Sequence, residues 1–222
     1  MATTNNIATG LAKIGLFLRS ANWRQAEAAA LSPTQAQILI HLTRRGPARI
    51  AALAEELGVT QPTASDSAAA LIRKGHLERR RDPADGRAAL LHPTLAGLRT
   101  AEAIAVWPDA LLAAVDALDA QEQVVFLKGL TKMIRYLQVK GAIPVQRMCA
   151  TCRFFRPNVH DDAVAPHHCA FVDAAFGDAN LRLDCSEHEP TDEPETDAIW
   201  RRFAGTPAGK ADAPPAVSGE AS

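Results

Sequence analysis

The chain has 222 residues, of which 24 are basic and 25 acidic, and its formal net charge is −1. Hydrophobic residues make up 47% of it, which supplies a packed core and excludes a wholly disordered chain. No apolar run reaches the ~20 residues that span a bilayer, and the polar N-terminus lacks the features of a secretory signal. We therefore expect a cytoplasmic protein without a membrane segment.

The first part of the chain has the spacing of four helices joined by short turns. A helix is predicted over 7–29. A second helix begins at the Ser-Pro-Thr-Gln sequence that starts at Ser32, which has the form of a capping box. A short helix over 50–57, a turn at Gly58 and a helix over 61–74 follow.

The pattern then changes to short extended segments. The segments 76–81 and 88–92 flank the turn-forming residues 82–86, which predicts a β-hairpin. Further helices with apolar stripes follow to about residue 140. The expected fold class is therefore mainly α with a small β-wing, the arrangement of a winged helix-turn-helix, followed by a small irregular C-terminal metal-binding module.

Charge supports DNA binding by this arrangement. Basic residues gather around the predicted hairpin, whereas the acidic residues of 184–197 lie far along the chain. In the helix over 61–74, Ala64, Ala68 and Leu71 are predicted to face inward. The candidate DNA contacts on that helix and the hairpin are Gln61, Thr63, Ser65, Arg73, Arg79 and Arg81.

Taken in order, these motifs resemble the MarR family of transcriptional regulators over roughly residues 7–140. The motifs that carry the resemblance are 31–35, 50–63, 77–79, 82–87 and Thr94-x-x-Gly97. The resemblance implies an obligate homodimer, built from the first and last helices, that binds a pseudo-palindromic operator in double-stranded DNA. It also implies that Arg87 enters the minor groove from the wing tip and that Asp85 orients it.

Asp66 departs from that family, which often has a basic residue at this position. A carboxylate there repels phosphate, although it can accept a hydrogen bond from cytosine N4. The alternative is that Asp66 only caps a helix or pairs within the protein.

The four cysteines form a second pattern, Cys149-x2-Cys152-x16-Cys169-x15-Cys185. Clustered cysteines in a cytosolic chain favour a metal over a disulfide, and a tetrathiolate set suits zinc or an iron–sulfur cluster. The spacing is similar to that of high-potential iron–sulfur proteins, although the last gap is longer here. We expect these four cysteines to bind an iron–sulfur cluster, [4Fe–4S] in composition.

Two other interpretations of the cysteines remain open. Zinc would take three cysteines and His188, which forms a C-x-x-H pair with Cys185, and His168 is a further possible ligand. A dithiol switch between Cys149 and Cys152 is the other alternative.

Three segments and one function follow from these patterns. Residues 1–140 are expected to bind DNA and dimerise, 141–190 to hold the metal or cluster, and 191–222 to form an acidic, then Ala/Pro/Gly-rich, disordered tail. The predicted function is a transcriptional regulator that senses redox state, oxygen or iron. The alternatives are a MarR-type regulator with structural zinc and a small aromatic effector, and an electron-transfer or partner-binding protein on a winged-helix scaffold. No catalytic motif occurs, so no enzyme is predicted.

Overall fold

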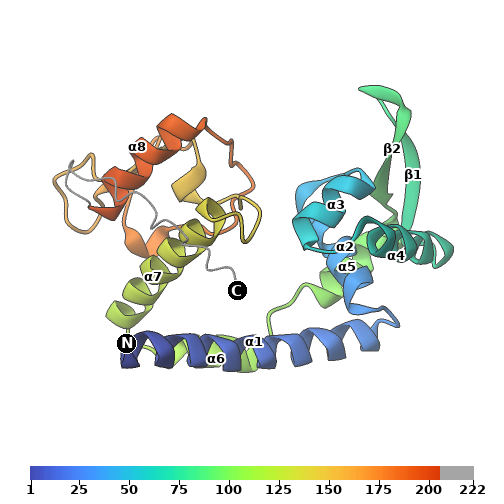
Figure 1. The fold of residues 1–222 in the computed structure, drawn as a ribbon, viewed down its shortest axis with the longest axis horizontal. Coiled ribbons are helices and arrows are strands. Elements are labelled where there is room, and N and C mark those ends of the chain that lie inside the picture. The colour runs from blue at the N-terminus through green and yellow to red at the C-terminus, as the bar shows by residue number, and fades with distance from the viewer. Residues whose placement is uncertain (206–222) are drawn as a thin grey trace, which may run out of the picture. The chain divides into compact units, whose positions relative to one another are not determined.

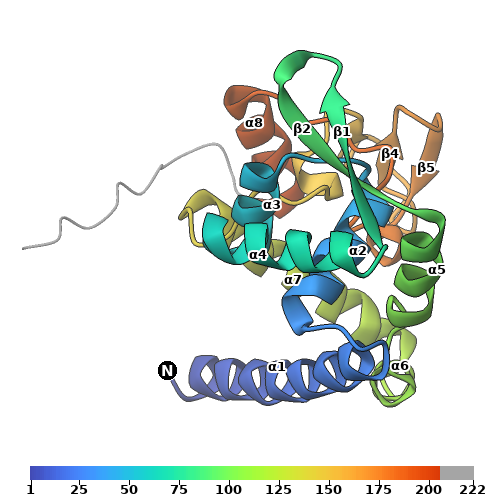
Figure 2. The ribbon, with the colours of Figure 1, turned by 90° about the vertical axis from the view of Figure 1, so that its right-hand side faces the viewer.

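The computed structural model describes residues 1–205. The chain divides into two compact units, Met1–Asp119 and Ala120–Ser222, which we call unit 1 and unit 2 (Figures 1 and 2). The boundary lies about one helix earlier than the expected position at residue 140. Among the described helices, none is long and apolar enough to cross a membrane.

Unit 1 is helical with one two-stranded sheet, which confirms the predicted mainly α fold with a small β-wing. Its elements are α1 (Ala2–Ala28), α2 (Pro33–Arg45), α3 (Ile50–Leu57), α4 (Gln61–Arg73), β1 (Leu77–Asp82), β2 (Asp85–Pro93), α5 (Leu95–Ile104) and α6 (Asp109–Asp116). The predicted capping box of α2 is present, because the Ser32 hydroxyl accepts from the Gln35 N–H and the Gln35 side chain accepts from the Ser32 N–H.

The core of unit 1 lies between α2, α3, α4 and the base of the wing. Its largest fully buried side chains are Ile38, Leu39, Leu42, Leu53, Leu71 and Leu91. The inward face predicted for α4 is confirmed, since Ala64, Ala68 and Leu71 are all buried. Burial of this stripe fixes which face of α4 points to solvent.

Strands β1 and β2 pair antiparallel and form a ribbon that extends past α3 in Figure 1. A register irregularity between Arg81 and Asp82 lies near its tip, and a bridge from Ala48 to Leu91 holds its base. The chain then turns into α5, where the Thr94 side chain caps the helix by accepting from the Gly97 N–H. The hairpin is therefore present as predicted.

The described part of unit 2, residues 120–205, is built from two helices and a small three-stranded sheet. Its elements are α7 (Ala120–Val139), the 3-10 turn η1 (Cys149–Thr151), β3 (Phe155–Arg156), β4 (His167–Cys169), β5 (Ala174–Phe176), the 3-10 turn η2 (Asp178–Asn180) and α8 (Glu193–Ala204). The sheet order is β3-β4-β5, and Cys169 pairs with Phe155 on one side and Ala174 on the other. Its core combines Cys152, Phe155, Leu181, Ile199 and Phe203.

The structure corrects two expectations about segment boundaries. Helix α7 belongs with the cysteine-rich segment, because Leu127 packs on that core and Gln138 donates to the Met148 sulfur. Residues 193–204 form a helix where a disordered tail was predicted. Asp192 caps this helix, and Ile199 and Phe203, four residues apart, bury one face of it. The rest of the predicted tail, 206–222, lies outside the described residues.

Candidate functional site

The helix-turn-helix consists of α3, a left-handed Gly58 and α4. Gly58 has φ 63°, which glycine adopts without the steric cost that other residues carry. Thr60 then caps α4 by accepting from the Thr63 N–H at 3.3 Å. Gln61 and Thr63 are exposed and Ser65 is half-buried, so the start of α4 presents polar side chains to solvent.

Asp66 is also exposed on α4. No hydrogen bond or ion pair to its carboxylate occurs within residues 1–205, which counts against the alternative that it caps or pairs internally. The carboxylate therefore stands free on the solvent face of the second helix.

The basic residues of α4 and the wing divide into two groups. Lys74 donates to the Ala30 carbonyl at 2.5 Å and to Gln35 at 2.8 Å, and Arg80 pairs with Glu78. The remaining guanidinium groups are exposed and make no hydrogen bond or ion pair in the part of the chain that the structure describes: Arg73, Arg79, Arg81 and Arg87. Four predicted DNA contacts are therefore available for phosphate or bases.

An ion-pair network fastens the wing to the helices. Arg49, which precedes α3, donates to the Asp82 carboxylate at 2.5 and 2.8 Å and lies 3.5 Å from Asp85. The Ala84 N–H, together with Arg49, holds the pKa of Asp82 below its ordinary value. Asp85 accepts the backbone N–H of Arg87 at 3.1 Å, so the structure links these two residues through the backbone.

All four cysteines line one cavity in unit 2. The cavity has a volume of about 150 Å³. Its walls include the rings of Phe154, Phe155, Phe171 and Phe176. The cysteines are free thiols: Cys152 is buried and the other three are half-buried. We call this space the thiol cavity.

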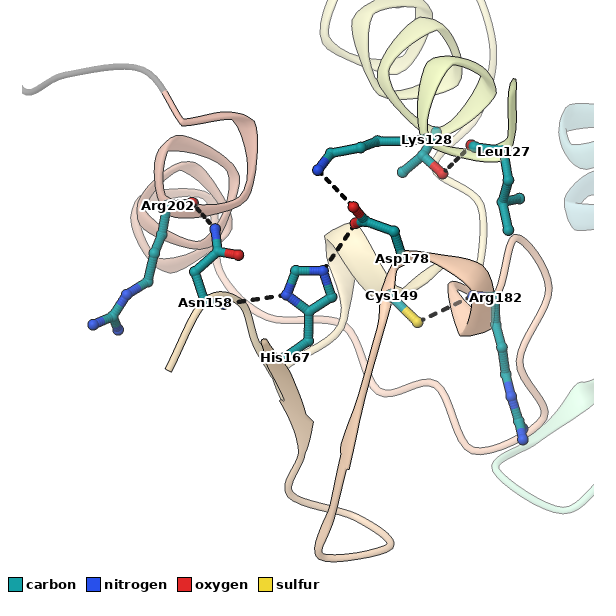
Figure 3. Close-up of polar contacts among 9 residues, drawn as sticks. Leu127, Lys128, Cys149, Asn158, His167, Asp178, Arg182 and Arg202 are labelled. Carbon is teal, nitrogen blue, oxygen red and sulfur yellow. Dashed lines mark hydrogen bonds and ion pairs between the residues drawn. The ribbon is translucent and has the colours of Figure 1, made fainter. Parts of the chain in front are cut away.

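The thiols of this cavity influence one another. The pKa of Cys149 is raised to about 11, mainly by burial and to a smaller extent by the other three cysteines. The Arg182 N–H opposes this shift by donating to the Cys149 sulfur at 3.3 Å (Figure 3). The Arg182 side chain also reaches the Cys185 sulfur at 3.8 Å.

The histidines proposed as alternative ligands lie outside the cavity lining. The His188 ring is 3.0 Å from the Thr151 hydroxyl, and the His168 ring lies 3.3 Å from both His160 and Asp173. Nowhere in residues 1–205 do three His, Cys, Asp or Glu side chains gather closely enough to share one metal ion.

A partly buried polar network joins the cysteine-bearing strand β4 to helix α7 (Figure 3). His167 is only 1% exposed; its Nδ1 accepts the Asn158 N–H and its Nε2 lies 3.0 Å from Asp178. Lys128 on α7 donates to the same carboxylate at 2.7 Å. Burial by itself would raise the pKa of Asp178, but the hydrogen bonds from Lys128 and His167 outweigh it and lower the pKa.

Arg49, Lys128, Asp178 and Arg182 were not among the residues predicted from the sequence. Their partners lie 33 or more residues away along the chain, except for the contacts of Asp178 with His167 and of Arg182 with Cys185. The motifs used above are local, so no sequence signal pointed to these contacts. A second cavity of about 180 Å³ lies in unit 1, and its lining includes Gln25, Gln37, Arg44 and Trp107.

The winged-helix geometry has counterparts among known proteins. The MarR family model matches residues 31–88. FabT of Streptococcus pneumoniae, solved in complex with DNA, is 25% identical, with a TM-score of 0.52 over 61% of this chain and 95% of that one. A MarR family protein of Bacillus stearothermophilus is 20% identical, with a TM-score of 0.54 over 61% and 96%.

A MarR protein of Peptoclostridium difficile is similar as well, at 22% identity and a TM-score of 0.53, over 61% of this chain and 89% of that one. No curated protein matches the chain in sequence. The fold of the winged-helix region is therefore MarR-type, as the sequence motifs indicated.

Proposed function

We propose that the protein is a DNA-binding transcriptional regulator of MarR type. The observation that carries this proposal is the set of four exposed, unpaired arginines on α4 and the wing, next to a capped helix with polar side chains at its start. In a winged helix, that helix enters the major groove and the wing reaches the backbone or minor groove. The match of residues 31–88 to the family and the similar fold of the FabT–DNA complex support this assignment.

We also propose that the regulator is a homodimer. Large apolar side chains remain exposed on three helices that pack incompletely within one chain: Ile7, Ile14, Leu16 and Phe17 on α1, Leu112 and Val115 on α6, and Val125, Phe126, Met133 and Tyr136 on α7. Helix α6 has no buried residue at all. Exposed apolar surface of this extent is typical of protein–protein interfaces, and a two-fold dimer matches a pseudo-palindromic operator.

The proposed cofactor is an iron–sulfur cluster held by Cys149, Cys152, Cys169 and Cys185. A tetrahedral zinc site would place each sulfur roughly 2.3 Å from one point, and no group of three or more such ligands is close enough for this within residues 1–205. A cavity of about 150 Å³ is comparable to one that holds benzene, which suits a cluster of several atoms. Surrounding phenylalanine rings limit solvent access, and such a shell tunes the stability and potential of a cluster.

The switch we propose begins with the residues that the cluster would hold together. The strands of unit 2 are two or three residues long, so the sheet depends on additional anchors such as a metal centre. Without those anchors, β4 is no longer held in place. His167 on β4 then loses its contact with Asp178, the carboxylate that pairs with Lys128 on α7. Helix α7, which exposes apolar side chains for the dimer, then shifts and changes the spacing of the two recognition helices.

Anaerobic purification with absorption and metal analysis on one sample tests the cofactor. We expect broad absorption near 400 nm and about four irons per chain, as for thiolate-bound iron. One zinc per chain in a colourless protein would overturn the cluster and favour the structural zinc. Cys169→Ser should lower the iron content.

DNA binding is tested with Arg87→Ala and the matched control Arg80→Ala, whose arginine is already paired with Glu78. A duplex selected from a random pool serves as the operator. We expect Arg87→Ala to weaken binding roughly 10- to 100-fold, while Arg80→Ala has a smaller effect. Equal loss of affinity in both variants, or no binding by the wild type, would contradict the proposal. Equal affinity of cluster-loaded and cluster-free dimers at one salt concentration would refute the switch.

A second candidate function is the binding of a small aromatic acid by unit 1. The cavity lined by Arg44 and Trp107 offers a cation and an aromatic ring within about 180 Å³, a combination that suits an aromatic carboxylate. Benzoate should then raise the unfolding temperature of the wild type but not of Arg44→Gln.

A further inference from the structure

The thiol cavity carries two opposite charges in an otherwise apolar and thiol-lined wall. Besides the thiols, its lining consists of apolar side chains, Asn180, Arg182 and Glu187. Both charged side chains are exposed, so they stand where the cavity meets solvent. Charges at such a position act on whatever the thiols hold.

Arg182 contacts two of the four sulfurs through two different groups. Its backbone N–H donates to Cys149 at 3.3 Å, and its guanidinium Nη1 lies 3.8 Å from the Cys185 sulfur. Figure 3 shows the backbone of Arg182 directed at Cys149. Within the described residues, its guanidinium forms no ion pair with a carboxylate, so no neighbouring anion neutralises its charge.

We infer that Arg182 raises, and Glu187 lowers, the reduction potential of the cluster proposed above. This inference rests on the proposed function, because it concerns the cofactor of that site. One-electron reduction by a one-electron carrier adds a negative charge to the cluster while no ligand bond breaks. A cation beside the sulfurs stabilises this added charge, whereas an anion destabilises it, and hydrogen bonds to the sulfurs also tune the potential.

Removing the positive and the negative charge of the thiol cavity in separate variants distinguishes this electrostatic role from a structural one. Arg182→Gln removes the cation but leaves the backbone N–H to Cys149 in place. Glu187→Gln removes the anion. Arg147→Gln is the matched control, because the Arg147 guanidinium is paired with Asp184 at 3.1 Å and reaches no sulfur.

The experiment is an anaerobic redox titration of the reconstituted full-length dimers with dithionite and mediators, followed by absorption and electron paramagnetic resonance. We expect Arg182→Gln to reduce the equilibrium constant for reduction about tenfold, which for one electron corresponds to a potential lower by about 59 mV. Glu187→Gln should raise the potential. Arg147→Gln should change the equilibrium constant for reduction less than threefold. Arg182→Lys, which keeps the charge, should restore most of the wild-type value.

Failure of this inference differs from failure of the proposed function. If the wild type takes up no cluster, both fall. If all variants carry the cluster with the wild-type spectrum but Arg182→Gln and Glu187→Gln leave the potential unchanged, or shift it in the same direction, the inference is wrong while the cluster proposal stands. Should Arg182→Gln lose the cluster, Glu187→Gln still decides the sign of the charge effect on the potential.

Discussion

Gly97 is the position in unit 1 where a single added methyl group has the largest predicted effect. A Cβ atom there would stand 2.1 Å from the His76 carbonyl oxygen and 3.3 Å from Leu39, whereas carbon and oxygen normally approach to about 3.3 Å. The oxygen cannot retreat freely, because it accepts the Thr94 N–H at 3.0 Å. Gly97→Ala must therefore displace the start of the wing from α5.

The cost follows from these contacts. Overpacking of this kind costs about 1–3 kcal/mol and loss of the Thr94 hydrogen bond about 1 kcal/mol, while alanine regains up to ~1 kcal/mol of helix propensity. The net destabilisation of about 1–3 kcal/mol should lower the unfolding temperature of unit 1 by roughly 10 °C. Far-UV circular dichroism measures this shift.

A glycine without neighbours is the matched control. Nothing lies within 4 Å of a Cβ built on Gly15 in α1, so Gly15→Ala should be neutral or stabilise by up to ~1 kcal/mol. If Gly97→Ala melted at the wild-type temperature, the close approach of α5 to the wing, and with it this account of how the wing is held, would be refuted.

Further predictions concern the polar networks. Lys128→Met should leave the iron content unchanged but reduce the difference in DNA affinity between cluster-loaded and cluster-free dimers. The control Lys132→Met, which replaces an exposed lysine on the same helix, should keep the full difference. The pKa of Asp178 is lowered, so its ionised form stabilises unit 2 above about pH 4. This contribution is lost as the pH falls through the lowered pKa. Acid unfolding of Asp178→Asn should therefore lack that part of the pH dependence. Arg49→Ala should speed amide hydrogen exchange in the wing and weaken DNA binding severalfold, and unchanged exchange would show that the ion pair does not hold the wing.

The features of unit 1 that could be predicted from the sequence are those set by neighbouring residues. The cap at Ser32, the left-handed Gly58 and the cap at Thr60 each involve contacts within about four positions, so the chain itself displays them. The ion pair between Arg49 and Asp82 spans 33 residues, so no local sequence pattern indicates it. The placement of α7 also escaped prediction, because its buried residues are polar: Thr131, Arg135 and Gln138.

The thiol cavity was predicted in part. The cysteine spacing indicated that four thiols come together, since so close a cluster rarely lacks a shared role. The sequence did not show which histidine enters the core. His167 and His168 are adjacent, and the alternation of a strand buries His167 and leaves His168 half-exposed. Strands of two or three residues carry too little pattern to reveal their register.

The division of the chain at Asp119 also separates two kinds of chemistry. Every cysteine lies in unit 2, between Cys149 and Cys185, and unit 1 has none. A thiol-specific oxidant or alkylating reagent can therefore modify unit 2 while every atom of the helix-turn-helix and wing keeps its original covalent structure. Any response of DNA binding to such a reagent must therefore originate in unit 2 and reach the arginines of the wing without a covalent change in unit 1.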